Sequence, residues 1–118
     1  MDWTVEYYRD SKDKEPVAEF IDALSNETRA KVFRTIKLLK NYGVLLKEPY
    51  TRQVRGKIRE LRIRDSAGAV RIFYFTFTGR RIILLHGFIK KTEKTPLSEI
   101  ETAEKRMNDF IDRQKELP

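Results

Sequence analysis

The chain of 118 residues contains no cysteine, which excludes disulfides, thiol nucleophiles and thiolate metal sites. It contains a single histidine, so a His-rich metal motif is excluded too, and no clustered carboxylates indicate another metal site. No apolar run approaches the roughly 20 residues that span a bilayer, and the first residues lack a signal-peptide pattern. We therefore expect a cytoplasmic protein with no membrane segment, metal or cofactor.

Positive charge is abundant but unevenly placed. The net charge is +7, and residues 47–94 carry 13 basic and 4 acidic side chains, whereas residues 1–46 carry 8 of each. A basic surplus confined to one segment is typical of a protein that binds nucleic acid or another polyanion. A generally basic, solvated surface is the alternative that this pattern leaves open.

The length fits a single domain, residues 1–118. Alternating apolar residues predict a strand at residues 3–8, and apolar residues three and four apart predict helices from about Lys14 to Leu24 and from Glu27 to Tyr42. Ser25 and Asn26 can cap the second helix, and Gly43 can end it. The stripes expected to face the core are Val17, Phe20, Ile21 and Leu24 in the first helix, and Val32, Phe33, Ile36 and Leu39 in the second.

Residues 57–64, 70–77 and 81–89 are rich in β-branched and aromatic residues and predict three strands, with breaks at Asp65–Gly68 and Thr78–Gly79. Residues 44–56 are expected to be an irregular connection. Thr95 and Pro96 predict the start of a last helix, whose stripe is Ile100, Ala103, Met107, Phe110 and Ile111. The order is β-α-α-β-β-β-α, an α+β fold in which an antiparallel meander packs against an N-terminal helical hairpin, with a C-terminal helix added.

The meander carries a candidate phosphate site. A two-residue turn at Thr78–Gly79 would set Arg71 directly opposite His86 on one face. Arg62 would lie on the same face as Arg71 only if the numbers of paired residues in the first hairpin add up to an odd value, because a shift by one residue moves Arg62 to the other face. Three lysines would border the same end of the sheet: Lys90, Lys91 and Lys94. Neither Arg71 nor Lys91 is expected to fill the core.

These groups suit RNA cleavage through the 2′-hydroxyl, which needs a base, an acid and cations but no metal. His86 is the first candidate for acid or base, because its unperturbed pKa is near neutrality. Each assignment has a structural alternative. His86 could be a hydrogen-bonded structural residue, Arg62 and Arg71 could pair with Glu60 or Asp65, and Tyr74 is expected in the core.

Three segments together resemble the HigB-like, phage-derived branch of the RelE/ParE type II toxin superfamily. They are Glu60-Leu61-Arg62, Arg71-Ile72-Phe73-Tyr74-Phe75, and the run from Leu84 through His86-Gly87-Phe88 and Lys90-Lys91 to Thr95-Pro96. The resemblance implies a RelE/ParE-like fold and a toxin that is a ribosome-dependent mRNA endoribonuclease, an mRNA interferase that inhibits translation and arrests growth. It also implies a helix-turn-helix, HigA-like antitoxin and a toxin–antitoxin heterotetramer.

Site residues follow from the resemblance and from the register. The expected catalytic residues are Arg62, Arg71, His86, Lys91 and Lys94, and the expected RNA-binding residues are Arg52, Arg55, Lys57, Arg59 and Lys90. The chain departs from the RelE pattern because no tyrosine follows Tyr74, which leaves the role of a late tyrosine unassigned. Two other functions stay open: a ParE-like inhibitor of DNA gyrase, and a non-catalytic module that binds nucleic acid or antitoxin.

Overall fold

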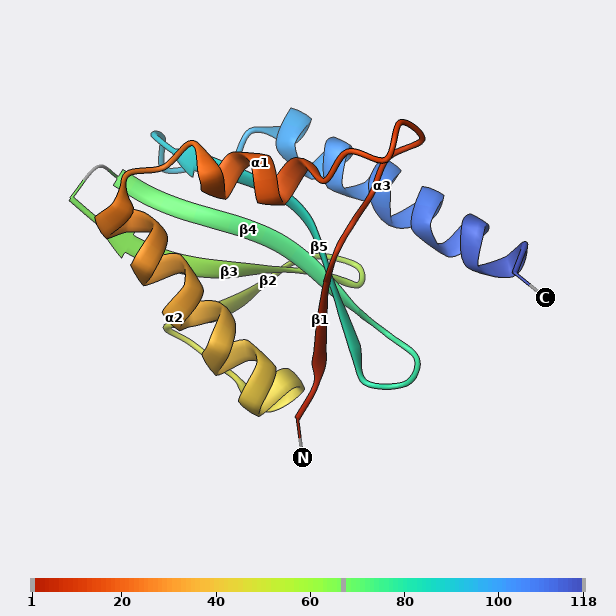
Figure 1. The fold of residues 1–118 in the computed structure, drawn as a ribbon. Helices are drawn as coiled ribbons and strands as arrows, with labels where there is room; N and C mark the ends of the chain where they lie inside the picture. The colour runs from red at the N-terminus through yellow and green to blue at the C-terminus, as the bar shows by residue number, and fades with distance from the viewer. Residues whose placement is uncertain (1, 67, 118) are drawn as a thin grey trace.

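The computed structural model describes residues 2–66 and 68–117 (Figure 1). Its elements, in order, are β1 (Thr4–Tyr7), α1 (Pro16–Asp22), α2 (Asn26–Tyr42), the 3₁₀ helix η1 (Gly43–Leu45), β2 (Thr51–Arg55), β3 (Ile58–Asp65), β4 (Gly68–Phe77), β5 (Arg81–Lys90) and α3 (Leu97–Lys115). The predicted α+β class is confirmed. The predicted order is wrong in one place, because β2 lies where an irregular connection was expected. Of the predicted break between β3 and β4, Ala67 lies outside the described residues.

The five strands form one sheet in the order β1-β5-β4-β3-β2. The strands β2, β3, β4 and β5 pair in antiparallel fashion, which confirms the predicted meander, and β1 pairs in parallel with β5. The meander is extended by one strand at each edge, so β3, β4 and β5 are all interior strands.

Helices cover both faces of this sheet (Figure 1). On one face, residues of α1 and α2 such as Val17 and Leu39 pack with Leu61 and Tyr74, which confirms Tyr74 as a core residue. On the other face, the predicted α3 stripe packs against a second set of sheet residues: Ile58, Phe73, Phe75, Ile83, Leu85 and Phe88.

The ends of α2 follow the predicted signals. Ser25 accepts a hydrogen bond from the Thr28 backbone N–H at 3.2 Å, and the helix ends at Gly43, whose φ is +53°. The predicted α2 stripe is wrong at Phe33, which is 47% exposed. Its neighbour Val32 is fully buried, and adjacent helical residues point about 100° apart, so the sheet receives only one of them.

Gly87 lets α1 approach β5 closely. A Cβ atom at this position would lie 2.5 Å from the ring of Phe20, which is closer than real Cβ contacts allow. The glycine within the His86-Gly87-Phe88 run therefore has a packing role on the α1 face, opposite to the face that carries His86.

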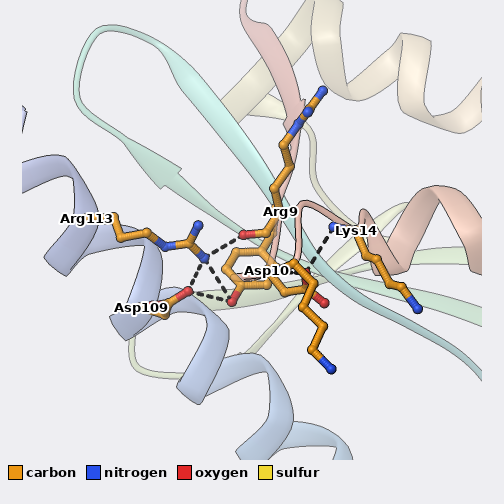
Figure 2. A network of polar contacts seen from close by, with 7 residues as sticks. Arg9, Asp10, Lys14, Asp109 and Arg113 are labelled. Atoms are coloured by element: carbon orange, nitrogen blue, oxygen red, sulfur yellow. Dashed lines mark hydrogen bonds and ion pairs between the residues drawn. The ribbon is translucent and has the colours of Figure 1, made fainter.

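Polar contacts tie α3 to the chain after β1 (Figure 2). The Tyr8 hydroxyl donates to Asp109 Oδ2 at 2.6 Å, and Arg113 Nη2 donates to the Arg9 carbonyl at 2.5 Å. Arg113 also forms an ion pair with Asp109. The hydrogen bonds from Arg113 and then from Tyr8 lower the pKa of the Asp109 carboxyl, while its slight burial opposes them.

Two kinds of feature are absent from the described residues. No helix there combines the length and apolar character needed to cross a membrane. In the same part of the chain, no group of three or more His, Asp or Glu side chains is placed to hold a metal ion.

Candidate functional site

The turn between β4 and β5 is one residue longer than predicted. Phe77 pairs with Arg81, so three residues form the loop, and Gly79 and Arg80 have φ values of +79° and +59°. Three-residue loops that end in a left-handed residue are common hairpin connections. The extra residue shifts the register, so Phe75 pairs with Ile83, and the predicted two-residue turn is wrong.

A β-bulge then shifts the register a second time. Tyr74 pairs with Leu84, but Phe73 pairs with His86, which leaves Leu85 as the additional residue. Arg71 consequently pairs with Phe88, and the predicted direct pair of Arg71 and His86 is wrong. Because each shift of one residue exchanges the two faces, two shifts restore the original face. Arg71 and His86 therefore still project from one side of the sheet.

β3 adds further cations to this side. Arg62 pairs with Arg71, so the two side chains share a face, which was the condition for Arg62 to join the predicted site. Arg64 pairs with Ala69, which itself pairs with Lys90. Directly opposed residues of antiparallel strands point to the same face. Arg62, Arg64, Arg71 and Lys90 therefore share the face on which α3 lies.

Four side chains on this face form what we call the arginine cluster: Glu60, Arg62, Arg64 and Arg71. Arg71 and Glu60 are each only 6% exposed, so the expectation that Arg71 lies outside the core is wrong. The Glu60 carboxylate lies 3.6 Å from Arg71 Nε and 3.5 Å from Arg62 Nε. The predicted alternative, in which Arg62 and Arg71 pair with Glu60, is thus confirmed, although both ion pairs are long.

The cluster has more positive charge and more donors than its own acid can satisfy. Neither Arg62 Nε nor Arg71 Nε has a hydrogen-bond partner among the described residues. Burial lowers the pKa of the Arg71 guanidinium; Glu60 opposes that shift, and the charges of Arg62 and Arg64 add to it. An anion bound beside the cluster would offset its excess positive charge, and phosphate oxygens can accept hydrogen bonds from guanidinium groups.

His86 is engaged at both ring nitrogens. Its Nε2 lies 2.8 Å from Glu99 Oε1, and its Nδ1 lies 3.1 Å from Arg106 Nη1. A guanidinium can only donate, so Nδ1 is the acceptor and Nε2 carries the proton toward Glu99. Arg106 Nη1 also donates to the carbonyl of Leu85, the bulge residue, at 2.9 Å. His86 therefore joins β5 to α3, as its structural alternative describes, and its acid–base role stays a prediction.

The predicted lysines lie at the end of β5. Lys90 is its last residue, while Lys91 and Lys94 are exposed on the loop that leads to α3 (Figure 1). Because Lys90 pairs with Ala69, and Ala69 with Arg64, this loop leaves the sheet beside the arginine cluster. The lysine loop, residues 90–94, thus brings the exposed donors of Lys91 and Lys94 to the border of the arginine cluster.

Arg52 pairs with Glu60 and therefore shares the face of the cluster, whereas the structure places three other predicted RNA-binding residues apart from it: Arg55, Lys57 and Arg59. Arg55 and Lys57 lie at the opposite end of β3, where Arg55 Nε donates to Glu104 of α3 at 2.9 Å. Arg59 pairs with Tyr74 and points to the other face. These residues extend the basic surface but do not belong to the same group as Arg62 and Arg71.

A groove beside the cluster contains cations that the sequence analysis missed. It lies between α2 and the end of β3, has a volume of about 970 Å³, and receives Lys31, Arg34 and Lys37 from α2. The β2–β3 pairing stops at Leu61, so the groove reaches round the edge of the sheet to Arg62, Arg64 and Arg71 on the α3 face. We call it the α2 groove. Spacings of three residues place these cations on one side of the helix. The equal numbers of basic and acidic side chains over residues 1–46 hide this signal. Of the 8 acidic residues in that segment, all but Glu27 precede α2.

The chain is similar in sequence to one protein family and to a bacterial protein. Residues 19–108 match the family model described as phage derived protein Gp49-like. Over 115 residues the chain is 35% identical to a protein named probable endoribonuclease HigB1 from Mycobacterium tuberculosis, in strains CDC 1551 / Oshkosh and ATCC 25618 / H37Rv. The match covers 95% of this chain and 82% of HigB1. The family match, residues 19–108, includes α2, the arginine cluster and the lysine loop.

Proposed function

The chain belongs to the Gp49-like family of phage-derived proteins, and from this membership we propose that it is the toxin of a type II toxin–antitoxin system, an endoribonuclease that cuts messenger RNA. The identity of 35% to HigB1 over 95% of the chain supports the endoribonuclease activity. The RelE/ParE-like arrangement implied by the sequence resemblance, a single domain over residues 1–118 and a cytoplasmic location are parts of the same proposal.

The observation that carries the proposed site is the arginine cluster. When the 2′-hydroxyl passes its proton to a water molecule and attacks the adjacent phosphorus, negative charge builds up on the phosphoryl oxygens before the P–O5′ bond breaks and the 5′ oxygen leaves. The buried Nε atoms of Arg62 and Arg71 have no hydrogen-bond partner among the described residues, and the burial of Arg71 holds its guanidinium in place before substrate arrives. Fixed donors of this kind stabilise a transition state without reorganisation.

The lysine loop supplies the groups that can move. We assign Lys91 and Lys94 to the phosphate and to the leaving 5′ oxygen, to which an ammonium group can donate a proton. Lys90, held by β5, is assigned to the neighbouring backbone phosphate. For His86 we propose that it positions α3 in place of acting as acid or base, because proton exchange would require it to release Glu99 or Arg106.

We further propose that cleavage takes place on the translating ribosome. Among the described residues, both candidate bases next to the cluster are engaged: Glu60 by two arginines and His86 by α3. Such a site stabilises charge but does little to align the 2′-hydroxyl for attack, and alignment is worth several powers of ten in rate. A ribosome that holds the mRNA in a bent conformation would provide it. A helix-turn-helix, HigA-like antitoxin, in a heterotetramer with the toxin, would cover the basic face.

Purified protein and a defined mRNA test this proposal. Primer extension should reveal cuts within the translated frame when ribosomes are present, and far fewer on the same RNA alone. The variant Lys105→Glu, on the exposed side of α3, should cut as well as the wild type. No cleavage under either condition, together with altered supercoiling of DNA by gyrase, would contradict the proposal and favour the ParE-like alternative.

A further inference from the structure

The α2 groove is lined by six basic side chains and, among the described residues, by no acidic one. The six are Lys31, Arg34, Lys37, Arg62, Arg64 and Arg71. Lys31 is balanced by Asp65, whose carboxylate lies 3.0 Å from its Nζ. Arg34 and Lys37 form no ion pair within residues 2–66 and 68–117, and both are exposed. The groove therefore has an excess of positive charge on both walls, one built by α2 and the other by β3.

Folding alone does not account for this concentration of charge. Like charges that face each other across a partly enclosed space repel, and the repulsion is stronger where water is scarce. The side chain of Arg71, at the end of the groove, is 7% exposed and its Nε lacks a hydrogen-bond partner among the described residues. An anionic ligand in the groove would offset the repulsion.

The shape and the remaining lining favour a chain of nucleotides over a single small anion. A volume of about 970 Å³ is at the upper end of the range for small-ligand pockets, roughly 300–1,000 Å³, and one phosphate would leave most of it empty. Tyr50, which is 44% exposed, lines the groove with Leu38 and Pro49 and offers an aromatic face. Cations for the backbone together with an aromatic ring for a base are the usual combination in single-strand binding sites.

We propose that the α2 groove binds the single-stranded RNA segment next to the cleaved phosphodiester, with Arg34, Lys37 and Arg64 on phosphates and Tyr50 stacked on a base. This inference rests on the proposed function, because Arg62 and Arg71 belong both to the groove and to the proposed reaction centre. A strand whose reacting phosphate lies at Arg71 continues along α2.

Binding of an uncleavable oligonucleotide tests the groove without any cleavage. We would measure fluorescence anisotropy with a labelled single-stranded 2′-deoxy oligonucleotide on the wild type, on Arg34→Glu/Lys37→Glu, and on Lys12→Glu/Lys105→Glu. The last variant changes the net charge equally at two exposed sites outside the groove. The groove variant should bind at least about tenfold more weakly, and its dependence on salt should be shallower by about 1.4 in log–log slope, since two phosphate contacts are lost.

Tyr50→Ala provides a second measurement with a different signature. Loss of one stacked base should weaken binding by about tenfold while the salt slope stays that of the wild type. Thermal melting should show that all variants fold, because Tyr50, Arg34 and Lys37 are exposed.

Three outcomes decide between the explanations. Equal losses of oligonucleotide affinity in the groove variant and in the control variant would overturn the inference, because net charge alone would then explain binding. Groove-dependent binding of a labelled poly-glutamate peptide, with no groove dependence for the oligonucleotide, would also overturn it and assign the groove to an acidic protein partner. Groove-dependent oligonucleotide binding by a protein that never cuts RNA would refute the proposed function and leave the groove assignment standing.

Discussion

At the scale of single residues, Arg71 has the most unusual environment. It is buried beside one carboxylate and two further arginines, and its Nε has no hydrogen-bond partner in the described part of the chain. We predict that Arg71→Lys lowers the cleavage rate by about tenfold to a hundredfold, because an ammonium group cannot present the two parallel donors of a guanidinium. Single-turnover cleavage on ribosomes measures this rate.

The choice of lysine matters for this experiment. Arg71→Ala would leave Glu60 buried without Arg71, and loss of one partner from a buried ion pair costs roughly 3–5 kcal/mol. Lysine keeps the charge, so the melting temperature should stay near that of the wild type. A fully active Arg71→Lys variant would show that the guanidinium has no special part in the reaction.

His86 gives a prediction of the opposite kind. His86→Ala should lower the free energy of unfolding by roughly 1–3 kcal/mol, because contacts to both Glu99 and Arg106 are lost. The cleavage rate, measured well below the melting temperature, should change by less than about tenfold. Urea unfolding and cleavage assays on the same samples separate the two effects. A stable variant with a rate lowered by about 10²-fold or more would instead support the acid–base role that the sequence predicts.

At the scale of elements, apolar patterns predicted most of the fold. The α3 stripe, the α1 and α2 helices and the three strands of the meander follow from the spacing of apolar residues, which burial enforces directly. β2 could not be found in this way. It contains Arg52, Gln53 and Arg55, has few apolar residues, and forms only because its backbone pairs with β3.

The register of the site was harder to predict than its elements. A turn with one more residue and a bulge at Leu85 each moved the β4–β5 pairing by one, and neither has a clear signal in the sequence. The structure shows what accompanies the bulge, since Arg106 of α3 donates to the Leu85 carbonyl. Contacts between distant segments of this kind decided which residues face Arg71.

The attachment of α3 predicts a dependence on pH. The pKa of Asp109 is lower in the folded protein than its ordinary value of 3.8, because Arg113 and then Tyr8 hydrogen-bond to the carboxylate. The folded state therefore binds this proton less readily than the unfolded state, and the stabilisation is present above the ordinary pKa and lost as the pH falls through the folded one. We predict that the melting temperature of Asp109→Asn falls less on acidification than that of the wild type.

Thermal melting from neutral to strongly acidic pH checks this prediction. Asp112→Asn, an exposed acid on the same helix without an ion pair among the described residues, serves as the matched control. Its pH dependence should follow the wild type. Parallel curves for Asp109→Asn and the wild type would show that the contact between Asp109 and Arg113 does not stabilise the fold.

The α2 groove makes a kinetic prediction as well. If α2 binds RNA outside the reacting phosphodiester, the contacts between α2 and RNA contribute the same binding free energy in the ground state and in the transition state. Arg34→Glu/Lys37→Glu should then raise KM by about tenfold while kcat changes less than about threefold. Steady-state cleavage over a range of programmed ribosome concentrations gives both constants. A fall in kcat with an unchanged KM would place Arg34 and Lys37 among the groups that act on the transition state.

At the scale of the whole molecule, folding brings only part of the basic stretch of sequence to one side of the protein. Arg62, Arg64, Arg71 and the lysine loop lie together there, and the α2 groove adds Lys31, Arg34 and Lys37. Release of counterions from RNA should therefore dominate binding, and affinity should fall steeply with salt. An antitoxin that neutralises the toxin by covering this side should compete with RNA.

The central claim is that this side of the molecule cuts messenger RNA by means of the arginine cluster. The most direct test is induced expression of the wild type, Arg71→Lys and Lys105→Glu in growing cells, followed by primer extension on several cellular mRNAs. We expect new 5′ ends within translated frames for the wild type and for Lys105→Glu, and a strong reduction of these ends for Arg71→Lys at equal protein level. Growth arrest without any new mRNA ends in wild-type cells would contradict it.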